Sequence, residues 1–343
     1  MVSDKKVLNV EDLRVCFDTY RGEVQAVRGV SFDVCEGEAL AIVGESGCGK
    51  SVTAHAVTRL LPEPPARITG GRINLDGTDV VNAGKKTLQG MRGSAVGMIF
   101  QDPMTSLNPT MTVGKQLREA LLRHNPGMGL KDAELKAAEL LSEVRIPNAA
   151  QRFSQYPSQF SGGMRQRVMI AIAIACKPKL LIADEPTTAL DVTTQAQILD
   201  LLKSIQSANR MAIILITHDL SVASCLVDRV AVMYAGQIVE KGLAKQIFQT
   251  AAHPYTWGLM DSLPRPDQDK SRDLNTIAGS PPSLLSPPAE CSFAPRCHFC
   301  MQVCSQRQPP GFELGPGHTC SCWLHHPMAA DMLKQAKEAS GHV

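Results

Sequence analysis

Five continuous apolar runs, separated by polar and amphipathic stretches, dominate the pattern between Leu8 and about Lys245. They are ALAIVG (39–44), AVGMIF (95–100), LLIAD (180–184), AIILIT (212–217) and RVAVMY (229–234). Strands that are covered on both faces appear as such runs, because neither face alternates with water. Runs of this kind that alternate with helical segments predict an α/β domain with a parallel or mixed sheet.

The strand pattern stops after Gln101, and helical spacing replaces it. Four apolar residues share one helical face before Pro147 ends the pattern: Ala137, Leu140, Leu141 and Val144. This predicts a helical subdomain at about residues 102–175.

The composition changes again from about His253, where prolines recur at short intervals up to residue 288. Proline-rich stretches favour extended connections. Six of the eleven cysteines then fall between Cys291 and Cys322. We therefore predict one large domain over residues 1–250 and a small cysteine-rich C-terminal module over residues 251–343.

The charge balance argues against one class of partner. The chain has 35 basic and 33 acidic residues, a net charge of +2 and no long block of like charge, so it lacks the electrostatic pattern of a nucleic-acid binder. Residues 1–13 lack the apolar segment of an export signal, which predicts a cytosolic chain with reduced cysteines. The most apolar segments, 168–176 and 211–217, are shorter than the ~20 residues that cross a membrane, so a pore would belong to another chain.

Residues 44–51, GESGCGKS, match the G-x-x-x-x-G-K-S pattern of a phosphate-binding loop and directly follow an expected strand. Backbone N–H groups of such a loop point at a β-phosphate at the N-terminus of a helix. We expect Lys50 to bridge the β- and γ-phosphates and Ser51 to ligate Mg²⁺. The expected binding set is Gly44, Ser46, Gly47, Cys48, Gly49, Lys50, Ser51 and Val52.

Polar residues at the ends of three later strands complete a hydrolytic site. Asp184 suits the Mg²⁺ shell, and Glu185 suits a general base that activates water, a role worth about 10²- to 10⁴-fold in rate. His218 follows the run 212–217 and can bond the γ-phosphate. Gln101 follows the run 95–100 and can contact Mg²⁺ and the attacking water. We expect Lys50, Gln101, Glu185 and His218 to carry the catalysis.

A second anion site is expected at Ser161, Gly162 and Gly163, which precede a long helical run. Small residues at a helix N-terminus let a phosphate approach closely. The alternative is an ordinary helix cap. One chain does not need two such sites for one ATP, whereas two chains facing head to tail can each lend this turn to the other's nucleotide.

These motifs together resemble the ATP-binding cassette (ABC) ATPases over residues 8–245. The motifs are GESGCGKS, Gln101, FSGGMRQR (160–167), LLIADEP, TALD (188–191) and His218. Four further segments are similar to the ATPase subunits of bacterial oligopeptide and dipeptide importers, and to the first, D-type member of their ATPase pair. These segments are GKSV (49–52), MIFQDPMTSLNP (98–109), DEPTTALDVTTQAQIL and HPYT (253–256).

The resemblance implies an ABC nucleotide-binding domain over residues 1–250 that binds ATP and Mg²⁺ between two subunits. Ser51, Gln101 and Asp184 would hold the Mg²⁺. The Ser161 to Gly163 turn of one chain would close the site of the other, and Asp191 would link the two sites. An aromatic residue about 30 positions before Lys50 stacks on adenine in this family, and Tyr20 is the candidate.

The resemblance also implies partners and a location. The partners would be a second ATPase subunit, a paralogue that gives a heterodimer, two membrane permeases contacted through residues 102–109, and an extracytoplasmic substrate-binding protein. The chain would lie at the cytoplasmic face of the bacterial inner membrane and drive peptide import. Alternatives are import of nickel or glutathione, a soluble cassette ATPase that acts on DNA or ribosomes, and a redox or regulatory sensor.

The family's C-terminal extension implies a metal centre. Its pattern selects Cys291, Cys297, Cys304 and Cys322, and four thiolates are the number that a [4Fe-4S] cluster needs. The chain also carries Cys300 and Cys320, which depart from that pattern. The pairs Cys297-x-x-Cys300 and Cys320-x-Cys322, with His298 and His318 nearby, would suit zinc instead. Unligated thiols are the third alternative.

Overall fold

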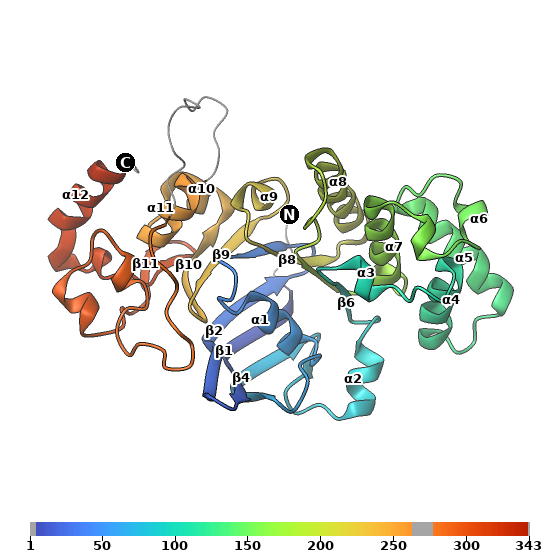
Figure 1. The fold of residues 1–343 in the computed structure, drawn as a ribbon, viewed down its shortest axis with the longest axis horizontal. Helices are drawn as coiled ribbons and strands as arrows, with labels where there is room; N and C mark the ends of the chain where they lie inside the picture. The colour runs from blue at the N-terminus through green and yellow to red at the C-terminus, as the bar shows by residue number, and fades with distance from the viewer. Residues whose placement is uncertain (1–4, 263–276, 342–343) are drawn as a thin grey trace.

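The computed structural model describes residues 5–262 and 277–341 (Figure 1). The segment 263–276 of the expected C-terminal module therefore lies outside the described residues. The five apolar runs form strands of one sheet, within one residue of the expected bounds. They are β3 (Ala39–Val43), β6 (Val96–Ile99), β7 (Leu180–Asp184), β8 (Ala212–Thr217) and β9 (Arg229–Tyr234).

These strands lie in the order β9-β3-β8-β7-β6, and each neighbouring pair is parallel. The expected sheet is confirmed. In β3, Ala41 and Val43 share a core with helices α7 (Gly162–Ile174) and α8 (Val192–Asn209). Leu40 and Ile42 point to the other face, towards α1 (Lys50–Val57). Both faces are covered, which explains the continuous apolar runs.

A second sheet, which we did not expect, covers the α1 side of the main sheet. Its antiparallel strands run in the order β2-β1-β4-β5. Their bounds are β1 (Lys6–Thr19), β2 (Gly22–Cys35), β4 (Ala66–Leu75) and β5 (Thr78–Asp79). In β1 the buried positions Leu8, Val10, Leu13 and Val15 are separated by more exposed ones and by irregular pairing after Val10. Half-buried strands of this kind give a weaker signal than a fully apolar run.

The helical subdomain lies at one end of the molecule, drawn in green in Figure 1. It contains α3 (Pro103–Ser106), α4 (Val113–His124), α5 (Leu130–Glu143), α6 (Ala149–Arg152) and α7. In α5 the expected apolar face is buried at Ala137, Leu140 and Leu141. Among the described residues, no helix is both long and apolar enough to cross a membrane. Two shorter helices lie between strands: α2 (Lys85–Met91) leads from β5 of the antiparallel sheet to β6, and α9 (Leu220–Ser224) leads from β8 to β9.

The C-terminal residues lie at the opposite end, drawn in orange and red in Figure 1, and they are not a separate module. After β9 the sheet continues antiparallel through β10 (Gln237–Leu243), β12 (His318–Cys320) and β11 (Phe312–Gly315). Helices α10 (Ala244–Thr250), α11 (Pro254–Asp261) and α12 (Ala330–Ser340) flank this part. Tyr255 and Phe293 also belong to the main hydrophobic core. The expectation of an independent cysteine-rich module is therefore not confirmed, because sheet and core are shared.

Candidate functional site

In the phosphate loop between β3 and α1, the Lys50 side chain bonds carbonyl oxygens of the loop itself. The Lys50 ammonium donates to the carbonyl oxygens of Gly44 and Glu45, at 2.7 and 2.9 Å. Two glycines make this path possible. A Cβ at Gly49 (φ +101°) would lie 2.4 Å from the Ala26 carbonyl oxygen, and one at Gly44 would lie 2.1 Å from that of Met233. The loop therefore packs tightly against neighbouring backbone, with Lys50 folded inward.

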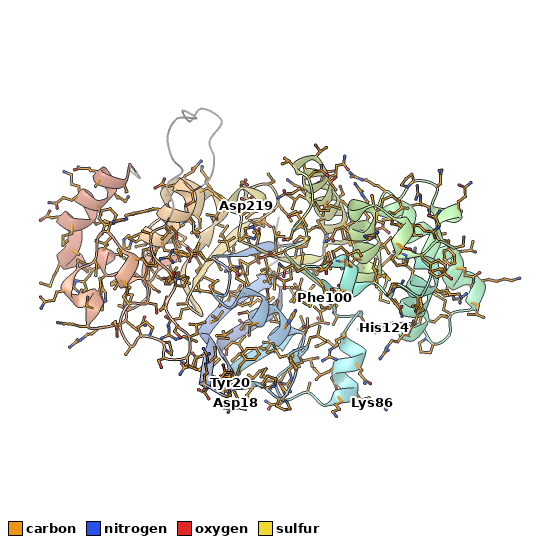
Figure 2. All side chains as sticks on the ribbon, in the orientation of Figure 1. Asp18, Tyr20, Lys86, Phe100, His124 and Asp219 are labelled. Atoms are coloured by element: carbon orange, nitrogen blue, oxygen red, sulfur yellow. The ribbon has the colours of Figure 1, made fainter. Side chains whose placement is uncertain are left out.

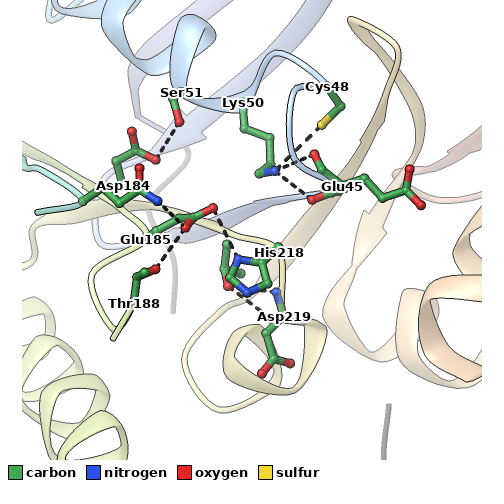
Figure 3. A network of polar contacts seen from close by, with 12 residues as sticks. Glu45, Cys48, Lys50, Ser51, Asp184, Glu185, Thr188, His218 and Asp219 are labelled. Carbon is green, nitrogen blue, oxygen red and sulfur yellow. Dashed lines mark hydrogen bonds and ion pairs between the residues drawn. The ribbon is translucent and has the colours of Figure 1, made fainter. Parts of the chain in front are cut away.

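Ser51 and Asp184 form a candidate Mg²⁺ site beside this loop. The Ser51 hydroxyl donates to a carboxylate oxygen of Asp184 at 3.0 Å (Figure 3). Burial raises the pKa of Asp184, because a low-dielectric site disfavours the charged carboxylate. A bound cation would offset that cost, and hydroxyl and carboxylate oxygens are ligands that Mg²⁺ accepts. The two residues thus fit the metal expected there.

Glu185 receives three side chains, and two of them were expected at the catalytic site. The Gln101 amide donates to one carboxylate oxygen at 2.8 Å, and the Thr188 hydroxyl donates to the same oxygen at 2.9 Å. The other oxygen lies 3.3 Å from Nδ1 of His218 (Figure 3). Glu185 itself is only 15% exposed, whereas His218 is 60% exposed. The carboxylate is therefore fixed in direction, as a base that acts on one water must be.

All these groups come from the same edge of the main sheet. The phosphate loop follows β3 and Gln101 follows β6. Asp184 ends β7, Glu185 follows it, and His218 follows β8. Parallel strands place their carboxyl ends side by side, and open α/β sheets bind ligands there. The structure therefore brings the four expected catalytic residues together. This arrangement can hold a nucleoside triphosphate and direct a water at its terminal phosphate.

Comparison with known proteins agrees with this geometry. Residues 27–188 match the family model "ABC transporter", and residues 239–304 match the model "Oligopeptide/dipeptide transporter, C-terminal region". The oligopeptide transport ATP-binding protein OppD of Bacillus subtilis (strain 168) is 52% identical over 96% of this chain and 92% of its own length. The dipeptide transport ATP-binding protein DppD of the same organism is 54% identical, over 93% and 95%.

The chain belongs to the ATP-binding proteins of oligopeptide and dipeptide ABC transporters. It is an ABC-type ATP hydrolase. Among solved structures, the dimeric post-hydrolysis state of the ATP-binding cassette MJ0796 bound to ADP and Pi is similar, with a TM-score of 0.62 and 25% identity. That likeness covers 69% of this chain and 98% of the other.

In this ABC ATPase the Ser161 to Gly163 turn begins α7, as expected. The Ser161 hydroxyl accepts from the Met164 N–H at 3.4 Å and so caps the helix. Ser161 and Gly162 are exposed. Within residues 5–262 and 277–341, no hydrogen bond or ion pair joins this turn to residues 44–51. The cap and the second anion site are compatible, because an exposed helix N-terminus keeps N–H groups free.

Two residues expected from the family pattern occupy exposed positions. Tyr20 is 91% exposed in the turn between β1 and β2, at the tip of the antiparallel sheet (Figure 2), and the Arg21 guanidinium lies 5.3 Å from its ring centroid. Asp191 caps α8, where its carboxylate accepts from the Thr194 N–H at 2.9 Å. This backbone hydrogen bond is the main cause that lowers the pKa of Asp191, and a second bond from the Thr194 hydroxyl adds to it. The described contacts give neither residue a role with nucleotide.

The expected metal ligands are not arranged around a single ion. In the described ranges, no group of three or more His, Cys, Asp or Glu side chains could hold a metal ion. The metal prediction therefore has no support from the side-chain geometry. The zinc alternative likewise has no support from this geometry; of its expected ligands, Cys300 is exposed whereas Cys320 is buried beside Glu240.

The four expected thiols nevertheless lie close to one another. Burial is the main cause that raises the pKa of each, and neighbouring thiols raise it further. The Cys297 pKa is raised to about 12, with Cys291, Cys304 and Cys300 contributing after burial. These four cysteines form no disulfide with one another and share a mostly buried environment.

Sequence reasoning missed three residues at this site: Thr188, Tyr255 and Arg296. Thr188 lies in the TALD motif, and Tyr255 lies in the HPYT motif, but neither was given a role. The Tyr255 hydroxyl accepts from the Glu45 N–H at 2.8 Å, and Arg296 bonds the Glu45 carboxylate. The HPYT motif could have pointed to Tyr255. No local pattern pointed to Arg296.

Proposed function

We propose that this chain couples ATP binding and hydrolysis to the import of di- or oligopeptides through partner membrane permeases. The observation that carries the proposal is the meeting of Gln101 and His218 on Glu185, beside the phosphate loop. The relatives' names supply the peptide substrate. Cargo in such a transporter passes through other chains, so this site fixes the energy source and not the peptide.

The proposed hydrolysis assigns one task to each side chain. Lys50, which bonds loop carbonyls in the structure, turns to the β- and γ-phosphates of ATP. Ser51, Asp184 and Gln101 would hold Mg²⁺, which would supply positive charge to neutralise the phosphates. Glu185 takes a proton from the attacking water, and His218 bonds the γ-phosphate. The bound ATP would replace the Gly44 and Glu45 carbonyls as the partner of Lys50.

Two chains are proposed to form each complete site. Ser161 to Gly163 of one subunit would bond the nucleotide that the other holds, and Asp191 would link the two sites. The exposed position of this turn, apart from the phosphate loop of its own chain, supports this assignment. The second subunit would be a paralogue. Tyr20 is proposed to stack on adenine, since its ring is almost fully exposed.

The proposed location is the cytoplasmic face of the bacterial inner membrane, where the chain would bind two permeases. Residues 102–109 would form the contact with them. Met104 in α3 supports this, because its side chain is 59% exposed in a segment capped by Asp102. A substrate-binding protein outside the membrane would deliver the peptide.

We also propose that Cys291, Cys297, Cys304 and Cys322 receive a [4Fe-4S] cluster. The support is their number and their mutual effect on titration, although they do not surround one ion. Iron and acid-labile sulfide at about four each in anaerobically purified protein would support the cluster. Cys297→Ser should lower both contents, whereas Cys176→Ser, which changes a cysteine just beyond the end of α7, should lower neither. Zinc without sulfide would contradict the proposal.

Reconstitution tests the transport function as a whole. The chain would be combined in proteoliposomes with its two permeases, its paralogue and the binding protein. ATP-dependent accumulation of a labelled tripeptide, lost in Glu185→Gln, is the expected result. Purification instead as a soluble particle that retains nucleic acid, with no affinity for the permeases, would overturn the proposal.

A further inference from the structure

An arginine of the C-terminal segment binds a glutamate of the phosphate loop. Arg296 makes a two-point ion pair with Glu45, with Nη1 to Oε2 at 2.7 Å and Nη2 to Oε1 at 2.9 Å. Glu45 is the second residue of the phosphate loop. The Arg296 side chain is 5% exposed, so the pair is largely shielded from water. Paired bonds of this kind fix direction as well as distance.

Arg296 is itself held in place by the segment before it. Its Nε donates to the Ala278 carbonyl at 2.9 Å, and Nη2 donates to the Ile277 carbonyl at 3.1 Å. The guanidinium also lies 5.8 Å from the ring centroid of Tyr234. A planar fork that is already fixed loses little freedom when it bonds a carboxylate. The C-terminal segment therefore presents Arg296 to Glu45 in one orientation.

The backbone of Glu45 is held from the same side. Its N–H donates to the Tyr255 hydroxyl at 2.8 Å. Tyr255 is fully buried, with its ring centroid 4.6 Å from that of Tyr234 and 5.4 Å from that of Phe293. Both the main chain and the side chain of this loop residue thus depend on residues beyond the nucleotide-binding strands.

Glu45 matters to the loop for two reasons. Its carbonyl oxygen accepts from Lys50 at 2.9 Å, so its position sets where the lysine rests. Its carboxylate also places a negative charge in the loop that must bind a polyphosphate. Arg296 offsets that charge. Without Arg296, Glu45 would be free to turn, and its charge would repel the incoming anion.

We propose that Arg296 is a positioning residue for ATP binding, through which residues 277–341 set the affinity of the phosphate loop. The proposal rests on the proposed role of residues 44–51 in binding ATP. It assigns the C-terminal segment a task in nucleotide binding that does not depend on any metal. Tyr255, from the HPYT motif, is the second point of the same connection.

Equilibrium binding of a non-hydrolysable Mg-ATP analogue to the full-length chain tests the proposal. Arg296→Gln should raise the Kd about tenfold, a change that corresponds to ~1.4 kcal/mol. The increase should shrink at high salt, because part of it is charge repulsion. The double variant Glu45→Gln with Arg296→Gln should recover that part. In the assembled transporter, KM for ATP should rise while kcat at saturating ATP stays near its original value.

Matched controls separate the possible failures. Arg229→Gln removes another partly buried arginine, which pairs with Glu38 at 3.0 Å at the opposite end of β9, and it should leave the Kd unchanged. Arg296→Lys keeps the charge but not the fork, and it should give a smaller increase. If Arg296→Gln does not fold, Arg296→Lys decides. If both Arg296 variants bind ATP with unchanged affinity while Lys50→Ala loses binding, this proposal alone is overturned. Unchanged binding in Lys50→Ala overturns the proposed ATP site instead.

Discussion

The side chains of Gln101 and Glu185, 84 positions apart in the sequence, meet through a hydrogen bond of 2.8 Å. Gln101 lies two residues after the edge strand β6, and Glu185 directly follows the neighbouring strand β7. The bond therefore ties the start of the helical subdomain to the expected catalytic base. A movement of residues 102–109, the proposed permease contact, would therefore be transmitted to Glu185 through Gln101.

Glu185→Gln should leave ATP binding intact and abolish turnover. The amide keeps the size and most bonds of the carboxylate but cannot accept a proton from water, so the rate should fall by about 10²- to 10⁴-fold. Steady-state phosphate release and nucleotide binding measure the two properties. Glu139→Gln, which changes an exposed glutamate of α5, is the control. Near-normal hydrolysis in Glu185→Gln would remove this residue as the base.

Thr188→Val should lower kcat by about threefold to tenfold, which corresponds to the ~0.5–1.5 kcal/mol that a typical hydrogen bond contributes, with little change in ATP affinity. The Thr188 hydroxyl donates to the Glu185 oxygen that Gln101 also bonds, at 2.9 Å, so its loss loosens the carboxylate. Thr188→Ser retains the hydroxyl and should restore most of the rate. Equal loss in both variants would mean that the hydroxyl does not position Glu185.

Sequence patterns predicted the parts of this fold that depend on local order. The five apolar runs predicted β3, β6, β7, β8 and β9, because strands that are buried on both faces consist almost entirely of apolar residues. The expected catalytic residues could be placed together from the sequence for a second reason, because parallel strands bring their carboxyl ends to one edge of the sheet.

What the sequence did not predict depends on contacts between distant segments. The antiparallel sheet has one covered face and irregular pairing, so its strands lack a continuous apolar signal. The pairing of β12 with β10, through Glu240 opposite Cys320, joins the C-terminal residues to the main sheet, although α10, α11 and β11 lie between the two strands in the sequence. Arg296 and Glu45 are 251 positions apart, and neither position carries a local pattern that points to the other.

Gly163→Asp should reduce hydrolysis at the partner's site by at least about 10²-fold while the variant chain still binds ATP at its own Lys50. A carboxylate at this exposed helix start would repel a phosphate that the partner holds. The new Cβ would lie 2.6 Å from Cγ2 of Thr194, so that side chain must shift. Gly127→Asp, with nothing within 4 Å, is the control. Loss of ATP binding in the variant chain itself would refute the shared site.

His253 gives the fold a defined dependence on acid. It is 2% exposed and accepts from the Tyr255 N–H through Nδ1 at 3.0 Å, so the neutral ring is the one that fits. Burial lowers its pKa to about 4, against the opposing attraction of Glu240 and with a smaller contribution from His325. The pKa of the unfolded chain's histidine is about 6.5. Between these two values the unfolded state binds a proton that the folded state does not.

The unfolding free energy should therefore fall as the pH drops from about 6.5 to about 4, and His253 should account for up to ~3 kcal/mol of that loss. Above about pH 6.5, His253 should make no pH-dependent contribution. His253→Asn keeps a side-chain acceptor at the start of α11 but cannot titrate. Denaturant unfolding at several pH values should give a shallower acid loss for this variant than for the original chain. Burial opposes the charged form of Glu240, but the hydrogen bonds that its carboxylate accepts outweigh this and lower its pKa below the usual range. Protonation of Glu240 therefore reduces stability at low pH in the original chain and in the variant alike. If the two chains lose stability in parallel as the pH falls, the pKa of His253 is the same in the folded and unfolded states, and the prediction is wrong.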